Sequence, residues 1–149
     1  MTQPARLPGR CLCGAVEFAL LPPLDFVAHC HCKSCRRAHG AAFVTWTSVP
    51  LERFEWIQGR ERVRWYRSSE TIEWGFCEAC GSSMLYRAIA PGHPESPKTD
   101  RMYVTVASID GELGQQPSAH VSFEEHVSWF HPRDLVPKYR GKGEAPIDE

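Results

Sequence analysis

The residues best suited to chemistry are three cysteines in the segment HCHCKSCRRAHG, residues 29–40. Cys30, Cys32 and Cys35 lie close enough along the chain to bind one metal ion together, and a thiolate is a strong ligand for Zn²⁺. Cysteines can also pair as disulfides. The segment therefore raises three possibilities: a disulfide, a metal ion that only stabilises the fold, or a metal ion that takes part in a reaction.

The other four cysteines form two short motifs that each end in glycine. The motifs are CLCG at 11–14 and CEACG at 77–81. Two sulfurs separated by one or two residues can bind the same ion, and a glycine after the second cysteine adopts the positive φ of such a turn without steric penalty. The motifs predict a closed structural zinc site with the ligands Cys11, Cys13, Cys77 and Cys80.

This division leaves Cys30, Cys32 and Cys35 for a second zinc ion. Three protein ligands leave one coordination position open, as in zinc sites that act on substrates. The site carries a net negative charge, and Arg36 and Arg37 follow it directly. We expect these arginines to offset that charge or to bind a carboxylate, because guanidinium and carboxylate groups form two parallel hydrogen bonds. A solvated basic helix face is the alternative.

Other arrangements of the ligands remain open at this stage. A histidine could close the second site as its fourth ligand, and the candidates are His29, His31 and His120. The cysteines could also be divided differently, with one ion bound by Cys11, Cys13, Cys30 and Cys32. Complete disulfide pairing is excluded because the chain has seven cysteines, an odd number.

The composition is typical of a globular protein, with 149 residues, 42% hydrophobic and 23% charged. We expect one domain over residues 1–149. No stretch reaches the roughly 18 apolar residues of a membrane-spanning helix. The N-terminal sequence lacks the apolar block of a secretory signal. We therefore expect a cytoplasmic protein, in a reducing compartment where clustered cysteines bind metal more often than they form disulfides.

The charge balance argues against general nucleic-acid binding. The net charge of −1 offers no broad basic surface for phosphates. One segment, RERVRWYR at residues 60–67, does interleave basic and aromatic side chains, as single-stranded nucleic-acid sites do. We interpret it as an exposed strand and expect no nucleic-acid partner.

The elements that position the cysteines are predicted to be short strands. Apolar and polar side chains alternate around Phe18, and aromatic and β-branched residues dominate later runs, as half-buried strands favour. Those runs are 42–49, 54–57, 63–66, 71–76, 83–86, 102–107 and 120–123. The best helix candidate is short, from Lys33 to His39, and ends at Gly40. The pattern predicts an all-β, β-dominated fold with one short helix.

Two segments are expected to lie outside the strands. Residues 90–100, APGHPESPKTD, are rich in proline and predict a surface loop. Residues 140–149 offer almost nothing apolar to bury, so we expect a flexible tail there.

The motifs together resemble a known family. The segments are CLCGAVEF, CHCKSCRRAHGAAF, FCEACGSSM and PSAHVSFEEHVSWFHPRDLVPKY, and their order and spacing over about residues 9–139 are similar to the glutathione-dependent formaldehyde-activating enzymes, also called the centromere-protein-V domain family. The resemblance implies an Mss4-like fold, a complex coiled β-sandwich with zinc knuckles. It also implies a structural zinc on Cys11, Cys13, Cys77 and Cys80, and a second, labile zinc on Cys30, Cys32 and Cys35.

The activity that the resemblance implies is the condensation of formaldehyde with glutathione, which is classed with the carbon–sulfur lyases. A glutathione thiol at the open zinc position would lose its proton near neutral pH and attack the aldehyde carbon. Polarisation of the aldehyde by zinc is the other route. We expect Arg36, Arg37 and His120 to contact the substrates. The alternative function is a non-enzymatic zinc-binding module for protein interaction, because a fold alone does not define function.

Overall fold

The computed structural model describes residues 5–94 and 96–148, and within these residues the fold is β-dominated. The described residues contain twelve strands, one α-helix and four 3₁₀ helices. The fold class predicted from the sequence is confirmed. The chain divides into two compact units, which comprise the described residues of Met1–Asp25 and Thr47–Gly114 (unit 1) and of Phe26–Trp46 and Gln115–Glu149 (unit 2).

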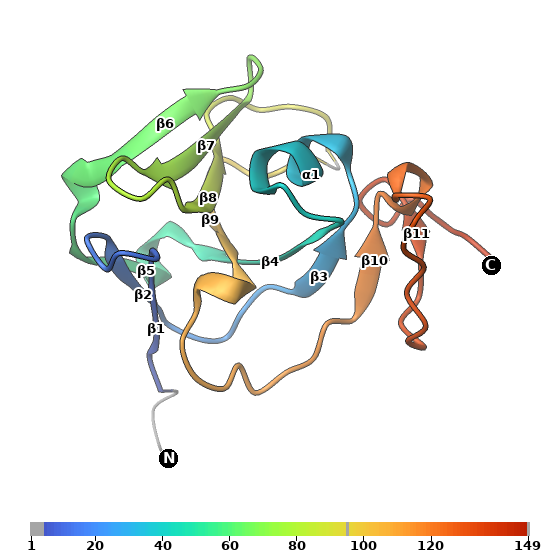
Figure 1. Ribbon diagram of the computed structural model, residues 1–149, viewed down its shortest axis with the longest axis horizontal. Helices are drawn as coiled ribbons and strands as arrows, with labels where there is room; N and C mark the ends of the chain where they lie inside the picture. The colour runs from blue at the N-terminus through green and yellow to red at the C-terminus, as the bar shows by residue number, and fades with distance from the viewer. Residues whose placement is uncertain (1–4, 95, 149) are drawn as a thin grey trace. The chain divides into compact units, whose positions relative to one another are not determined.

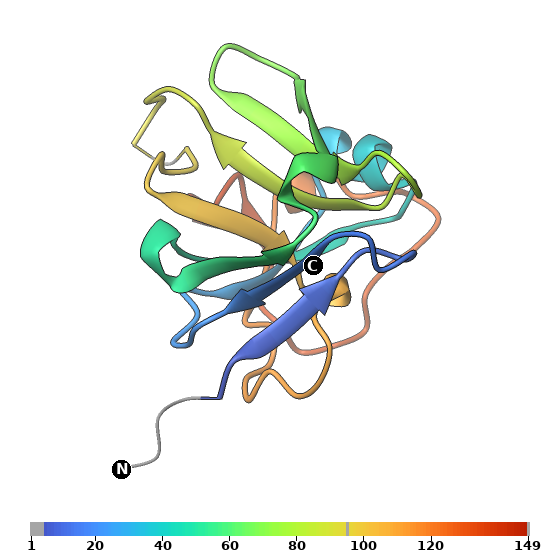
Figure 2. The same cartoon turned by 90° about the vertical axis from the view of Figure 1, so that its left-hand side faces the viewer.

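Unit 1 contains two sets of antiparallel strands. The first is a three-stranded sheet in the order β1 (Leu7–Arg10), β2 (Glu17–Leu20) and β5 (Phe54–Gln58), with β1 and β2 drawn in blue in Figure 2. The second is a meander in which each strand pairs with the next: β6 (Val63–Arg67), β7 (Ile72–Cys77), β8 (Ser83–Ala88) and β9 (Arg101–Thr105). The 3₁₀ helices of this unit are η1 (Leu51–Arg53), η2 (Arg60–Arg62) and η3 (Val106–Ser108).

The core of unit 1 is built from the apolar faces of these strands. Phe18 and Leu20 of β2 are fully buried, as predicted, but Ala19 between them is only 2% exposed, so both faces of this strand are covered rather than one. Met84 and Leu85 of β8 are buried in the same cluster. Cys77, at the end of β7, also belongs to this cluster and is fully buried. The candidate metal ligands are therefore tied to the hydrophobic core as well as to each other.

Unit 2 is organised around a short parallel pair of strands. In Figure 1, β3 (Val27–Cys30), in blue, lies beside β10 (Ala119–Val121), in orange. The helix α1 (Lys33–His39) follows β3 and ends at Gly40, as the sequence predicts, and Gly40 has the left-handed φ of 60° that is common at helix C-termini. The remaining elements are β4 (Val44–Pro50), which begins in this unit and ends in unit 1, η4 (Phe123–Glu125), β11 (Tyr139–Arg140) and β12 (Ala145–Pro146).

Several element boundaries differ from the sequence prediction. β9 ends at Thr105, and the predicted run at 120–123 ends as a strand at Val121, because 3₁₀ turns follow both. β1 and β3 were not predicted: β1 contains a proline and a glycine, and β3 runs directly into the cysteine motif. The strands β11 and β12 pair with each other where the sequence predicts a flexible tail. Backbone hydrogen bonds do not require apolar side chains, so the composition of this segment gives no sign of the pairing.

The predicted loop at 90–100 contains neither helix nor strand in its described residues; Glu95 lies outside them. Residues 1–4, on which the expectation of no secretory signal partly rests, also lie outside the described part of the chain. Among the described residues, no helix has the length and apolar character required to span a membrane.

Gly59, which follows β5, should be intolerant of any side chain. Its φ is +74°, and a Cβ there would lie 1.9 Å from the Ala15 carbonyl oxygen. Gly111 has a similar φ of +88° but open space around it. We expect Gly59→Ala to lower the free energy of unfolding by about 2–4 kcal/mol, and Gly111→Ala by only about 1 kcal/mol, the cost of the left-handed conformation alone. Urea denaturation measures both, and equal losses would contradict the clash.

Candidate metal centres

The first candidate centre lies in unit 1. It is the four-cysteine group, whose sulfurs all lie within 4.8 Å of one another: Cys11, Cys13, Cys77 and Cys80. The Sγ atoms of Cys11 and Cys13 are 3.6 Å apart, and those of Cys13 and Cys77 are 3.9 Å apart. Sulfurs around a tetrahedral zinc ion lie about 3.8 Å apart, because each Zn–S bond is about 2.3 Å long. The group therefore has the donor set and the spacing that one zinc ion requires.

Two glycine turns present these sulfurs. The Gly14 N–H donates to the carbonyl of Cys11 at 3.2 Å, and the Gly81 N–H donates to the carbonyl of Cys77 at 2.8 Å. Both glycines have positive φ, 79° and 76°, which lets the chain reverse directly after the second cysteine of each motif. The role that the sequence assigns to these glycines is confirmed.

Ser82 supports the four-cysteine group from the second turn. Its Oγ accepts a hydrogen bond from the Leu12 N–H at 2.9 Å and lies 3.1 Å from Cys80 Sγ. Hydrogen bonding from Ser82 lowers the pKa of Cys80 to about 5, against the opposing effect of burial. Cys80 is therefore a thiolate at neutral pH, the form that binds metal.

The second candidate centre lies in unit 2. It is the three-cysteine group, with all three sulfurs within 4.8 Å of one another: Cys30, Cys32 and Cys35. Cys30 ends β3, Cys32 is the N-cap of α1, and Cys35 is buried within the helix. The Cys35 N–H donates to Cys32 Sγ at 3.3 Å, so the sulfur takes the place of the oxygen that usually caps a helix. Within the described residues, no histidine belongs to this group.

The three sulfurs share one negative charge when no metal is bound. Hydrogen bonds from Cys32 and Cys35 lower the pKa of Cys30 to about 2. The same interactions raise the pKa of Cys32 and of Cys35 above the ordinary value. The Trp46 indole N–H also donates to Cys35 Sγ, at 3.4 Å. The Cys30 sulfur therefore favours its anionic form, and a cation bound by the group would stabilise that form further.

The two arginines behind this group differ in their surroundings. Arg36 is half-buried, and its Nε is a buried donor with no hydrogen-bond partner in the described part of the chain. Arg37 is exposed. Arg36 therefore has a buried donor without a protein partner, whereas the donors of exposed Arg37 can bind water.

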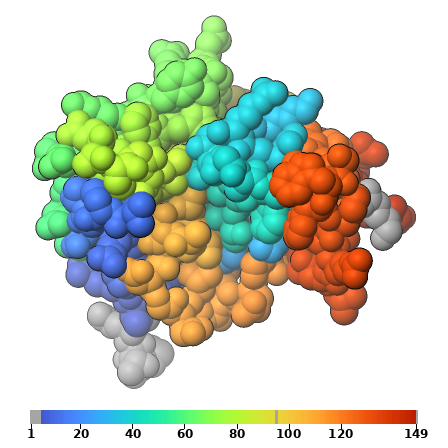
Figure 3. Space-filling view, viewed as in Figure 1, coloured from blue at the N-terminus to red at the C-terminus, as the bar shows by residue number. Residues whose placement is uncertain are grey.

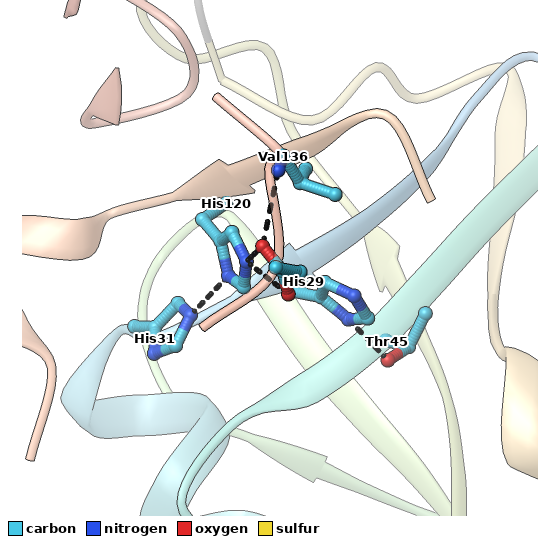
Figure 4. A network of polar contacts seen from close by, with 6 residues as sticks. His29, His31, Thr45, His120 and Val136 are labelled. Carbon is cyan, nitrogen blue, oxygen red and sulfur yellow. Dashed lines mark hydrogen bonds and ion pairs between the residues drawn. The ribbon is translucent and has the colours of Figure 1, made fainter. Parts of the chain in front are cut away.

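His120 lies in a different group. It joins His29 and Asp134 in the imidazole–carboxylate group, in which one donor atom of each residue lies within 4.8 Å of the others. Its Nε2 is 3.0 Å from Asp134 Oδ1, and its Nδ1 is 2.8 Å from His31 Nε2. His29 Nδ1 lies 2.8 Å from Thr45 Oγ1. In Figure 4, His31 lies on one side of His120, and His29 points toward Thr45.

The hydrogen bonds fix the proton positions along this chain of residues. Burial alone would raise the pKa of Asp134, but hydrogen bonds from His120 and the Val136 N–H bring it below the ordinary value. The carboxylate accepts from His120 Nε2–H, and in the neutral form of His120 its Nδ1 then accepts from His31 Nε2–H. Burial and the neighbouring histidines lower the pKa of His31 to about 4. Its Nδ1 therefore keeps a lone pair, which is buried without a partner among the described residues.

These positions answer the questions that the spacing left open. All seven cysteines lie in the described residues and are free, so no disulfide forms. The sulfurs assemble as four and three, in the division predicted from the motifs. None of His29, His31 and His120 joins the three-cysteine group. His120 is 1% exposed and both of its ring nitrogens are hydrogen-bonded, which leaves no free donor for a substrate.

Sequence reasoning missed several residues of these sites. Trp46 contacts a sulfur, Thr45 contacts an imidazole, and Asp134 contacts His120 from fourteen residues further along the chain. No motif spacing signals any of them. The sequence contained one usable signal, the alternation of His29 and His31 with the cysteines, which predicts two donor sets on opposite sides of one strand.

Comparison with protein families agrees with this geometry. The model described as glutathione-dependent formaldehyde-activating enzyme matches residues 6–125, most of the chain and both cysteine groups. This chain belongs to that family. The family resemblance noted from the motifs is confirmed.

Two individual proteins are similar to this family member. A protein of Schizosaccharomyces pombe, named as an uncharacterized lyase, is 30% identical over 83 residues, 52% of this chain and 55% of that protein. The chain thus matches about half the length of this curated relative. A crystal structure of a Rhodobacter sphaeroides protein matches with a TM-score of 0.54 and 28% identity, over 74% of this chain and 97% of that one.

Metal binding to the three-cysteine group should release protons. At neutral pH Cys30 is ionised, whereas Cys32 and Cys35 retain their protons because their pKa values are raised. An ion that binds all three sulfurs displaces two protons, so its apparent affinity should rise by up to about 100-fold per pH unit below those pKa values.

Isothermal titration calorimetry counts these protons. Zinc is added, in buffers with different ionisation enthalpies, to protein from which metal has been removed at the three-cysteine group only. Cys35→Ser should release about one proton instead of two. Zinc binding without proton release would contradict the assigned protonation states.

Proposed function

We propose that this family member binds two zinc ions and acts on glutathione or a related thiol, forming or cleaving its adduct with formaldehyde or another small aldehyde. The observation that carries the proposal is the three-cysteine group. Three sulfurs lie at ligand spacing, and in the described residues no histidine completes the set. A zinc ion held there keeps a coordination position for a small molecule. The family description and the lyase-named relative support the same class of reaction.

The residues present fit zinc at both cysteine groups. The four-cysteine group supplies a complete tetrahedral set and would hold a structural ion. The three-cysteine group would hold the second ion, which when bound supplies a Lewis acid that favours the ionised form of a thiol. The Trp46 N–H withdraws electron density from Cys35 Sγ and so limits how strongly this sulfur neutralises the cation.

The reaction itself is an addition. The thiolate sulfur attacks the aldehyde carbon, a carbon–sulfur bond forms, and the carbonyl oxygen takes up the proton that the thiol has lost. Cleavage is the reverse. The buried Arg36 Nε–H, which lacks a partner in the described residues, is suited to receive a carboxylate of glutathione beside the metal. We propose Arg36 as the principal substrate contact, with exposed Arg37 in a lesser role and His120 in an indirect one.

One observation favours the second candidate, a module for protein interaction. Trp129 and Leu135 are 72% and 100% exposed, and Phe130 is 42% exposed. All three belong to the C-terminal part of unit 2, drawn in orange and red on the surface in Figure 3. Large apolar side chains at a surface can contact a partner. A coordination position left for a small molecule has no role in such a module, so the lyase-type function remains our first proposal.

The basic segment at 60–67 carries less free positive charge than its sequence suggests. Arg62 and Arg64 both form ion pairs with Glu78, at 2.9 and 2.7 Å. A nucleic-acid phosphate would have to compete with this carboxylate. We therefore continue to expect a small-molecule thiol and aldehyde as partners.

Removing one sulfur of the three-cysteine group should abolish catalysis and leave the fold intact. We expect two zinc ions per wild-type chain by native mass spectrometry and one in Cys32→Ser, because the four-cysteine group is untouched. Adduct formation from glutathione and formaldehyde, followed by NMR, should exceed the spontaneous rate only with wild-type protein. A variant that loses one zinc yet keeps the full excess rate would refute a catalytic role for that ion.

The two arginines provide a matched pair of variants. Arg36→Gln should weaken glutathione binding roughly 10- to 100-fold, the value of a charged hydrogen bond, whereas Arg37→Gln should change it less than about threefold because an exposed ion pair contributes little. Zinc content should stay the same in both. Calorimetric titration measures the affinities, and glutathione diethyl ester, which lacks the carboxylates, should not distinguish Arg36→Gln from wild type. Equal affinities in wild type and Arg36→Gln would remove this arginine from the site.

A further inference from the structure

The imidazole–carboxylate group has no part in the proposed reaction, although it is built from residues beside the cysteines. His29 is the residue before Cys30 in β3. Successive side chains of a strand point to opposite faces, so His29 leaves β3 on the side opposite Cys30. There it meets His120, which faces it in the parallel register of β3 and β10, with the two rings 4.8 Å apart. The group is therefore separate from the three-cysteine group.

Each imidazole makes a hydrogen bond outside the group through its Nδ1. His29 Nδ1 lies 2.8 Å from Thr45 Oγ1, and His29 Nε2 makes no hydrogen bond to any described residue. His120 Nδ1 lies 2.8 Å from His31 Nε2, which leaves His120 Nε2 for Asp134. Histidines that bind metals show this same arrangement, in which a second group fixes the ring through its other nitrogen.

The carboxylate completes a donor set of known preference. Asp134 Oδ1 receives the Val136 N–H at 3.1 Å, which orients the carboxylate toward His120. The nitrogen–oxygen distance of 3.0 Å in that pair is also the separation expected of neighbouring ligands on one ion, because metal–nitrogen and metal–oxygen bonds are about 2.0–2.2 Å long. Two imidazoles and one carboxylate suit borderline divalent ions such as Zn²⁺, Fe²⁺ and Co²⁺.

We propose that His29, His120 and Asp134 form a third metal site, which takes a borderline divalent cation on nitrogen and oxygen ligands. Three protein ligands leave positions open for water or a small anion. Ion binding at His120 Nε2 displaces its proton to Nδ1, so the hydrogen bond to His31 reverses direction. His31 Nε2 then accepts, and its own proton moves to the buried Nδ1.

Cobalt added to protein whose two cysteine groups already hold zinc tests the site directly. We expect native mass spectrometry to show one bound Co²⁺ in addition to two Zn²⁺, with a d–d spectrum that lacks the strong thiolate-to-cobalt charge-transfer band of a cysteine site. Asp134→Asn should raise the dissociation constant roughly 100-fold or more, and Thr45→Val, which removes only the support of His29, about tenfold. Nitrogen-15 NMR of wild type should show His31 changing tautomer on cobalt binding.

The exposed His131, which contacts His126 and lies outside the group, supplies the control. His131→Gln should bind cobalt as wild type does. Absence of a third ion, or a third ion bound equally well by Asp134→Asn, would overturn the proposal. Asp134→Asn keeps an oxygen for the Val136 N–H, so it remains decisive if the buried His120→Gln variant fails to fold. The two zinc ions are counted in the same spectra, so failure of this site is distinguishable from failure of the proposed function.

Discussion

The structure depends on holding sulfur atoms so close together that they cannot all be ionised without a cation between them. Two thiolates about 4 Å apart repel by about 4 kcal/mol in a partly shielded protein environment, and the four-cysteine group brings four sulfurs within 4.8 Å. A cation bound there would turn this repulsion into attraction. It would link the turn after β1 to the turn after β7, in a region where Cys11 and Cys77 also pack in the core. Metal binding and core packing in unit 1 would then be one cooperative event.

The two cysteine groups differ in how much of the chain each one joins. The four-cysteine group connects residues more than sixty positions apart, so an ion bound there would close a long loop and act as a structural link. The three-cysteine group is contained in the end of β3 and the first turn of α1. Its geometry comes from local structure, with Cys32 as the helix cap. A site assembled this locally could lose or exchange a bound ion with little effect on the rest of the fold.

The strand β3 gives unit 2 two distinct kinds of chemistry. Its alternation directs thiol sulfur to one face and imidazole nitrogen to the other. Soft sulfur and borderline nitrogen–oxygen sets prefer different ions. The parallel pairing with β10 then supplies His120 opposite His29. One four-residue strand thus contributes to two donor groups that the fold keeps separate.

The sequence by itself determined the local motifs, because their evidence lies within a few residues. The glycine after each short cysteine pair, the compact Cys30–Cys32–Cys35 motif, the limits of α1 and most strands of unit 1 follow from spacing and alternation over fewer than ten residues. The four-and-three division remained a prediction until the structure brought Cys11 and Cys13 beside Cys77 and Cys80. Only the tertiary structure decided which distant side chains meet those motifs. Trp46 reaches Cys35, Asp134 reaches His120, and Arg36 retains a buried donor without a partner in the described chain, because strand pairing and burial set these contacts. Such contacts depend on register and packing between separate elements of the fold, and no residue spacing records them.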